Sequence, residues 1–173
     1  MASTQAKNAK SLGNVLVIGG CGFLGHHIVN LLSQDYTCNV SVLDLRTTRN
    51  RRSDVDYYDG DITDLAGLID IFNKVKPDVV IHTASPEANS GVPKTVLSKV
   101  NVEGSLCVIE ACQSTGVTAL VYTSSASVIS DNASDLINAN EVYPVLRAPQ
   151  QTDYYSETKA SSFVHRDPGH GND

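Results

Sequence analysis

Tyr155 and Lys159 stand four positions apart near the end of the chain, a spacing that puts both side chains on one face of a helix. There the ammonium group favours ionisation of the phenol. A phenol tuned in this way can exchange a proton with an alcohol or a carbonyl while a hydride moves to or from a nicotinamide. Ser125 follows an apolar segment and could hydrogen-bond the same oxygen. Because such tyrosine-lysine pairs also arise by chance, the hypothesis depends on what precedes them in the chain.

Three glycines, Gly19, Gly22 and Gly25, follow a short apolar segment and open a helical pattern. Gly19 permits a tight turn, Gly22 lets a pyrophosphate approach the backbone, and Gly25 lets helix and strand pack closely. Phe23 and Leu24 begin the helix, whose N-terminus would face the anion. The motif predicts a dinucleotide site, with a purely structural turn as the alternative.

Asp44 ends the next apolar segment, at about the distance from the glycines that a ribose-binding acid needs. It is predicted to accept hydrogen bonds from the adenosine ribose, and its charge would repel a 2′-phosphate, so NAD is favoured over NADP. The arginines that follow either soften this preference or form a solvated loop; they are Arg46, Arg49, Arg51 and Arg52. Further on, Asp61 and Ile62 are predicted to border the cofactor, with an exposed acid in a turn as the alternative for Asp61.

Apolar segments alternate with helical patterns along the chain. Strands are expected at 14–18, 39–43, 55–58, 78–81 and 119–123, and helices at 23–33, 65–75, 95–114 and from 153. This order indicates an α/β fold with a doubly wound parallel sheet of Rossmann type, whose ligands lie at the carboxyl ends of the strands. We expect a flexible N-terminus over 1–12, an NAD-binding domain over 13–160 and a disordered tail over 161–173.

The chain has 173 residues, a net charge of −6 and 41% hydrophobic residues, the composition of one soluble globular domain. The negative charge disfavours nucleic-acid binding. No apolar stretch has the length of a membrane span or the form of a secretory signal, so a cytoplasmic location is expected.

The cysteines and histidines predict no metal site. The four cysteines lack zinc-ligand spacing, and Cys107 and Cys112 fall in an apolar helical pattern that indicates core packing. His82 is expected to pack beside the sheet rather than act in catalysis. His26 and His27 begin a surface helix, and no special role is expected for them.

Five motifs follow one another in the chain. They are Val-Ile-Gly-Gly-Cys-Gly-Phe-Leu-Gly at 17–25, His-Thr-Ala-Ser-Pro at 82–86, Val-Asn-Val-Glu-Gly at 100–104, Tyr-Thr-Ser-Ser-Ala-Ser-Val at 122–128 and Asp-Tyr-Tyr-Ser-Glu-Thr-Lys at 153–159. With these motifs the chain resembles the extended short-chain dehydrogenases/reductases, and within them the 3β-hydroxysteroid dehydrogenase group, over residues 14–160.

The resemblance implies roles for the residues that match. Tyr155 would be the proton acceptor, Lys159 would bind the nicotinamide ribose, and Ser125 would orient the substrate oxygen. The implied reaction oxidises a sterol 3-hydroxyl with NAD, and the resulting ketone accepts the electrons released when a 4-carboxylate leaves as carbon dioxide. A related polycyclic alcohol is the wider substrate class.

Three more residues enter through the same resemblance. Ala84 and Ser85 would line the nicotinamide side of the cleft. For Asn101 a supporting role and a buried side chain that satisfies backbone groups are equal alternatives.

Family members continue well past the Tyr-x-x-x-Lys helix into a region that holds the substrate, whereas residues 161–173 resemble nothing in the family. We therefore expect a fold without the C-terminal substrate region, as a misread splice junction or a frameshift would produce. The alternative function is a truncated nucleotide-binding pseudoenzyme or regulatory partner without turnover. Peripheral association with the endoplasmic reticulum and a homodimer are further expectations.

Overall fold

The computed structural model describes residues 11–87, 91–140 and 142–164. These residues form two compact units, which we call the sheet unit and the helical unit. The sheet unit holds the described residues up to 84 together with 107–123, and the helical unit holds the described residues of 85–106 and from 124 onward.

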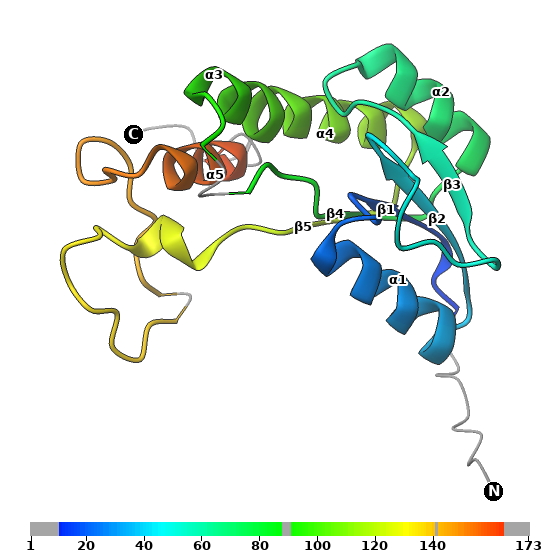
Figure 1. Ribbon diagram of the computed structural model, residues 1–173, viewed down its shortest axis with the longest axis horizontal. Helices are drawn as coiled ribbons and strands as arrows, with labels where there is room; N and C mark the ends of the chain where they lie inside the picture. The colour runs from blue at the N-terminus through cyan, green and yellow to red at the C-terminus, as the bar shows by residue number, and fades with distance from the viewer. Residues whose placement is uncertain (1–10, 88–90, 141, 165–173) are drawn as a thin grey trace, which may run out of the picture. The chain divides into compact units, whose positions relative to one another are not determined.

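Five parallel strands make up the sheet, in the order β3-β2-β1-β4-β5 (Figure 1). Their bounds are β1 Gly13–Ile18, β2 Cys38–Asp44, β3 Asp56–Asp59, β4 Val79–His82 and β5 Ala119–Tyr122. In this register Ile18 lies opposite Leu43 on one side and His82 on the other, so the strands end along one edge. The predicted doubly wound α/β fold is confirmed, and the strand ends differ from the expected ones by at most one residue.

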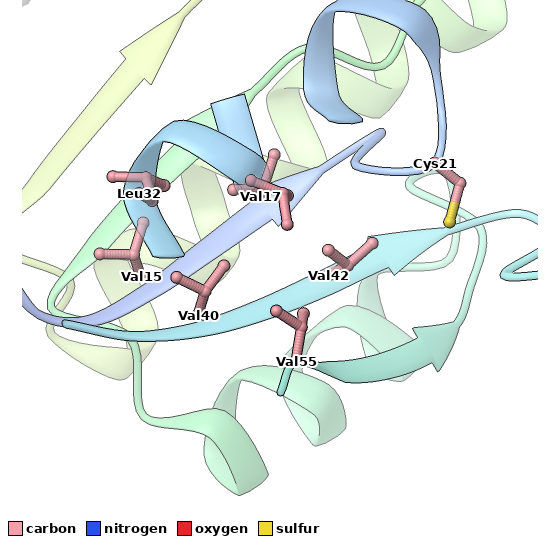
Figure 2. Packing of buried hydrophobic residues seen from close by; sticks show 8 residues of the cluster. Val15, Val17, Cys21, Leu32, Val40, Val42 and Val55 are labelled. Carbon is pink, nitrogen blue, oxygen red and sulfur yellow. The ribbon is translucent and has the colours of Figure 1, made fainter. Parts of the chain in front are cut away.

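Alternate residues of the strands pack against helices on opposite faces of the sheet. Helix α1 (Phe23–Asp35) lies on one face and α2 (Leu65–Val75) on the other (Figure 1). The cluster under α1 is made of valines of β1 and β2, residues of α1, one thiol from the glycine turn and a valine just before β3 (Figure 2); its buried members are Val15, Val17, Cys21, Val29, Leu32, Val40, Val42 and Val55. A run that is apolar on both faces is what a buried parallel strand requires.

Two predictions about packing are confirmed in the sheet unit. The side chain of His82 is 2% exposed, and its ring lies 5.5 Å from that of Tyr122, centroid to centroid. Cys112 is buried and Cys107 is half-buried, both on α4 (Ser105–Thr115).

The helical unit contains short helices and turns. They are α3 (Lys94–Leu97), the π-helix η1 (Ser98–Gly104), the start of α4, the 3-10 helix η2 (Ala126–Ile129) and α5 (Tyr154–Val164). The described part of the stretch between Ser130 and Asp153 forms turns and bends, as its polar composition predicts.

The predicted continuous helix over 95–114 is wrong in its middle, where η1 widens the turn. Asn101, at the centre of η1, is 1% exposed, and the hydroxyl of Ser162 donates to its carbonyl oxygen at 2.5 Å. A buried polar side chain that must reach partners outside its own helix favours such a wider turn. Helical periodicity alone gives no sign of it.

The predicted tail also begins too early. Helix α5 continues through Val164, beyond the expected end at Ala160. The hydroxyls of Ser161 and Ser162 donate to the helix carbonyls of Glu157 and Thr158, each at 2.9 Å. Residues 1–10 and 165–173 of the predicted terminal segments lie outside the described residues.

Candidate functional site

The turn between β1 and α1 can be built only from glycine at two positions. Gly19 has a φ of +83°, and a Cβ there would lie 2.7 Å from the backbone nitrogen of Ala84. A Cβ on Gly25 would collide with the carbonyl oxygen of Gly19. Gly19 itself donates its N–H to the carbonyl oxygen of Leu43 at 2.7 Å, which ties the turn to the end of β2.

Gly22 stands in a different environment. It precedes α1 with an extended backbone, and the nearest atom to a Cβ there would be the carbonyl oxygen of Gly19 at 3.2 Å. A Cβ at Gly22 would thus crowd this one backbone oxygen and meet no other atom within 4 Å, and a glycine leaves the remaining space open to a ligand. The first N–H groups of α1, at Phe23 and Leu24, have no partner within the helix and point where an anion binds. Their own side chains are exposed.

Asp44, at the end of β2, holds the glycine turn directly. Its Oδ2 accepts the backbone N–H of Cys21 at 3.0 Å. Its Oδ1 has no hydrogen-bond partner among the described residues and can accept from a ribose hydroxyl. Burial raises the pKa of the Cys21 thiol, and the neighbouring Asp44 carboxylate adds to this effect. One oxygen of the Asp44 carboxylate thus holds the turn, and the other is left to face a ligand.

The loop from β2 to β3 uses two of its four arginines for its own structure. Arg51 donates to the carbonyl oxygen of Thr47 at 3.0 Å. Arg52 pairs with Asp54 at 2.8 Å, and this hydrogen bond raises the pKa of the guanidinium. The remaining two are exposed and make no hydrogen bond or ion pair within the described chain; they are Arg46 and Arg49. The solvated-loop interpretation therefore holds for half of the set.

Two residues of this region were not predicted. Asn50 has a φ of 55°, and its side-chain amide donates to the carbonyl oxygen of Cys21 at 2.8 Å. Asp59 accepts the backbone N–H of Thr47 at 2.8 Å, and this bond lowers the pKa of the carboxyl. Asparagine tolerates a positive φ better than most residues, but nothing in the sequence marks this asparagine among the others.

Asp61 and Ile62 follow β3 in a turn. One carboxylate oxygen of Asp61 accepts both the N–H and the hydroxyl of Thr63, each at 2.9 Å. Ile62 is only 6% exposed, so its side chain packs into the unit. The structure gives both residues a role in the turn, and only the second oxygen of Asp61 is left for a ligand.

Ser125, in the helical unit, caps η2. Its Oγ accepts the N–H of Ser127 at 3.2 Å and lies 2.7 Å from the Ser127 hydroxyl. Gln151, which is 5% exposed, donates to the carbonyl oxygens of Ser127 and Ser130. The turn of η2 thus holds the hydroxyl of Ser125 in place. Gln151, from the segment before α5, holds that turn by its two hydrogen bonds.

Tyr155 and Lys159 lie on one face of α5, as predicted from their spacing. Asp153 begins the helix: its Oδ2 accepts the N–H of Ser156 at 2.8 Å and the Ser156 hydroxyl at 2.6 Å. Tyr155 is half-buried and Lys159 is 3% exposed. A capped helix with a buried lysine gives both side chains a fixed direction.

Asn101 connects the segment after β4 with α5. The hydroxyl of Ser85 donates to its Oδ1 at 2.9 Å, and its Nδ2 donates to the Thr158 hydroxyl at 3.0 Å. Thr158 donates in turn to the carbonyl oxygen of Tyr155 at 2.7 Å. The side chain of Asn101 thus bonds to two hydroxyls and not to backbone groups, and the hydroxyl of Ser162 donates to its carbonyl oxygen, so the supporting role stays a prediction.

Each unit therefore gathers part of the predicted set. The sheet unit brings together the glycine turn, Asp44 and the loop with Asn50, and the helical unit holds Ser85, Ser125 and the tyrosine-lysine pair. Among the described residues no three His, Cys, Asp or Glu side chains are placed to hold a metal ion. None of the helices described here has the length and apolarity to cross a membrane.

Comparison with known proteins gives these units a family. The profile of the 3-beta hydroxysteroid dehydrogenase/isomerase family matches residues 16–164. The chain is 37% identical over 163 residues to sterol-4-alpha-carboxylate 3-dehydrogenase, decarboxylating, of Candida albicans, covering 89% of this chain and 45% of that protein. The human protein of that name is 36% identical over 159 residues, covering 91% of this chain and 40% of the relative. The chain spans less than half the length of the curated relatives that it matches.

A solved structure shows the same fold. UDP-glucose 4-epimerase of Thermus thermophilus, in complex with NAD, is 30% identical and superposes with a TM-score of 0.76, covering 87% of this chain and 49% of that one. The chain belongs to the 3-beta hydroxysteroid dehydrogenase/isomerase family.

Proposed function

We propose that the protein is an NAD-dependent oxidoreductase that oxidises the 3β-hydroxyl of a sterol, with a 4α-carboxysterol as its substrate. Family membership and the names of its fungal and mammalian relatives support this substrate class. A related polycyclic alcohol is the wider class that the same chemistry would serve.

The single observation that carries the cofactor is the glycine turn. A side chain at Gly22 would occupy space that the fold itself leaves open, and the first N–H groups of α1 face that space. The free oxygen of Asp44 suits a ribose with both hydroxyls, and its negative charge disfavours a 2′-phosphate. These residues fit NAD better than NADP, in agreement with the NAD complex of the Thermus relative.

The catalytic residues that we propose are Tyr155, Lys159 and Ser125. The phenol oxygen of Tyr155 would accept the proton of the sterol hydroxyl, and Ser125 would hold the same oxygen through its hydroxyl. Lys159 would bind the nicotinamide ribose. When bound, NAD supplies the hydride acceptor.

Loss of the carboxylate then follows from the chemistry of the substrate. Oxidation of the 3-hydroxyl gives a ketone at the carbon next to the one that bears the carboxylate. As the carbon-carbon bond breaks and carbon dioxide leaves, the electron pair passes toward the ketone oxygen, and a proton then returns to the ring carbon. The hydroxyl of Ser125, held by Ser127, is suited to stabilise the developing negative charge on that oxygen.

The remaining expectations belong to the same proposal. Residues 13–160 would form the NAD-binding domain, with Ala84 and Ser85 on the nicotinamide side. Because the hydroxyl of Ser85 is engaged with Asn101, Ser85 would meet the cofactor through its backbone. The substrate is a membrane lipid, which supports peripheral association of the protein with the endoplasmic reticulum from the cytoplasm. The edge strand β5 offers a surface on which a homodimer could form.

Binding is tested by titrating the chain with NADH and following the fluorescence of the nicotinamide. Wild-type protein should bind, and Gly22→Asp should abolish binding because a carboxylate would occupy the pyrophosphate position. A folded wild-type sample without NADH affinity would overturn the proposal.

Turnover is tested separately, with a 4α-carboxysterol and NAD. Sterol-dependent formation of NADH that disappears in Tyr155→Phe would support the oxidoreductase. NADH binding without any turnover would instead support the alternative, a nucleotide-binding protein that acts as a regulatory partner.

A further inference from the structure

His26, in the first turn of α1, is tied to two neighbours through both of its ring nitrogens. Its Nδ1 lies 3.2 Å from the carbonyl oxygen of Asn50, and its Nε2 lies 3.0 Å from the side-chain amide of Asn30. The ring is half-buried between α1 and the loop from β2 to β3.

The neighbours determine where the ring carries its proton. Arg52 donates to the Oδ1 of Asn30 at 3.1 Å, so the other end of that amide, Nδ2, must point at His26 as a donor. The Nε2 of His26 therefore accepts, and its Nδ1 carries the hydrogen that is donated to the carbonyl of Asn50. Only the neutral ring makes both bonds.

Asn50 links His26 to the glycine turn. Its side-chain amide donates to the carbonyl oxygen of Cys21 at 2.8 Å, while the N–H of Cys21 is held by Asp44 at 3.0 Å. Both polar backbone groups of Cys21, in the middle of the turn, are thus bound from outside the turn. We call the bonded set Arg52, Asn30, His26, Asn50 and Cys21 the clasp.

We propose that His26 is a positioning residue for the dinucleotide, and that the clasp holds the glycine turn in its binding geometry only while His26 is neutral. This inference rests on the proposed cofactor site and adds a regulation to it. The sign follows from the bonds: dinucleotide affinity is full while the ring is neutral and falls when the ring is protonated.

The charges around the ring favour the same outcome. A protonated Nε2 would face the amide hydrogens of Asn30 and add a positive charge next to Arg52, whose own charge is paired with Asp54. On its own helix the ring lies 5.7 Å from that of His27, centroid to centroid. From the loop, Arg49 adjoins Asn50 in the chain. Protonation thus removes a hydrogen bond and leaves two donors face to face.

The test uses ADP-ribose as the probe, because its charge is constant over the range and it needs no nicotinamide site. Calorimetric titration of the full chain should show affinity about three- to tenfold weaker in mildly acidic buffer than in neutral buffer, the loss of roughly one hydrogen bond. His26→Asn keeps a donor for the Asn50 carbonyl but cannot titrate, so its affinity should be the same at both pH values.

His27→Asn is the matched control, since it removes an imidazole from the next position of the same helix, where the ring makes aromatic contacts to Phe23 and His26. It should keep the pH dependence of the wild type. Equal affinity of the wild type at both pH values, or a fall that persists in His26→Asn, would overturn the inference.

Asn50→Gly tests the other end of the clasp. Glycine accepts the φ of 55° without strain, so the variant removes the amide that binds Cys21 and leaves the backbone path unchanged. Affinity for ADP-ribose in neutral buffer should fall about three- to tenfold, and the pH dependence should flatten. Unchanged affinity would show that the turn does not need the clasp.

A measurement without ligand separates this inference from the proposed function. In NMR spectra of the free chain, the side-chain amide signals of Asn30 and Asn50 should shift with the same midpoint as the His26 ring, and not in His26→Asn. Amide signals that stay constant while the His26 ring signal shifts would overturn the clasp, even if the chain binds ADP-ribose. A chain that shows the coupled shifts but binds no dinucleotide would overturn the proposed function and leave the clasp as a structural device.

Discussion

The carboxylate of Asp44 holds the backbone N–H of Cys21 at 3.0 Å, so the residue that would select the ribose also fixes the turn that would bind the pyrophosphate. One carboxylate oxygen accepts from Cys21, and the other is left for the ribose. Substitutions at Asp44 can therefore separate charge from geometry.

Asp44→Asn should keep an oxygen that accepts from Cys21 but remove the negative charge. We expect affinity for NADPH relative to NADH to rise by roughly tenfold, because the repulsion of the 2′-phosphate is lost. Asp44→Ala should weaken both and lower the free energy of unfolding by about 1 kcal/mol, since it also removes the bond to Cys21. Binding titrations and chemical denaturation measure the two effects, and an unchanged cofactor ratio in Asp44→Asn would contradict the assignment.

Gly22 and Gly25 should respond differently to alanine. Gly25→Ala forces a Cβ against the carbonyl of Gly19, and overpacking of this kind costs about 1–3 kcal/mol of the free energy of unfolding. Gly22→Ala crowds the same carbonyl oxygen at 3.2 Å and no other atom, so it should cost less stability than Gly25→Ala while NADH affinity falls. Thermal unfolding with NADH titration distinguishes the two, and equal loss of stability in both variants would be the opposite result.

Thr158 should matter through its hydroxyl. Thr158→Val keeps the shape but leaves the buried amide of Asn101 without its acceptor, at a cost of about 1–3 kcal/mol in the free energy of unfolding. Thr158→Ser retains the hydroxyl and should restore most of that loss. Chemical denaturation measures both, and similar stability of the valine and serine variants would show that the bond contributes nothing.

Asp59 should make stability depend on pH. Its pKa is lowered in the folded chain, chiefly by the N–H of Thr47, so its contribution to stability is full above the ordinary aspartate pKa of about 3.9 and is lost as the pH falls through the folded value. Asp59→Asn should therefore be less stable than the wild type near neutral pH, and the difference should shrink in acid. Denaturation midpoints across pH measure this, and a stability difference that stays constant down to acid pH would contradict it.

Local patterns in the sequence were enough to predict the sheet and the glycine turn. Apolar runs predict the strands, the glycines after the first run predict the position of α1, and helix α2 was predicted at its observed bounds, Leu65–Val75. The spacing of Tyr155 and Lys159 likewise predicts a shared helix face. Each of these depends on residues that are close together in the chain.

The features that escaped prediction join residues that are far apart. Asn50 meets Cys21 across 29 positions, and Asn101 meets Thr158 across 57. The π-helix η1 around Asn101 and the hydrogen bonds of His26 form only because other elements bring partners to these residues. No periodicity encodes such contacts, and a resemblance to a family transfers roles but not hydrogen bonds.

The buried thiol of Cys21 provides a way to measure opening of the glycine turn. The side chain is fully buried and its pKa is raised by that burial, so alkylating reagents can attack it only when the turn opens. The rate at which a maleimide labels Cys21 thus measures how often the turn opens, and it needs no signal from the cofactor. A dinucleotide bound at the turn would lower this labelling rate.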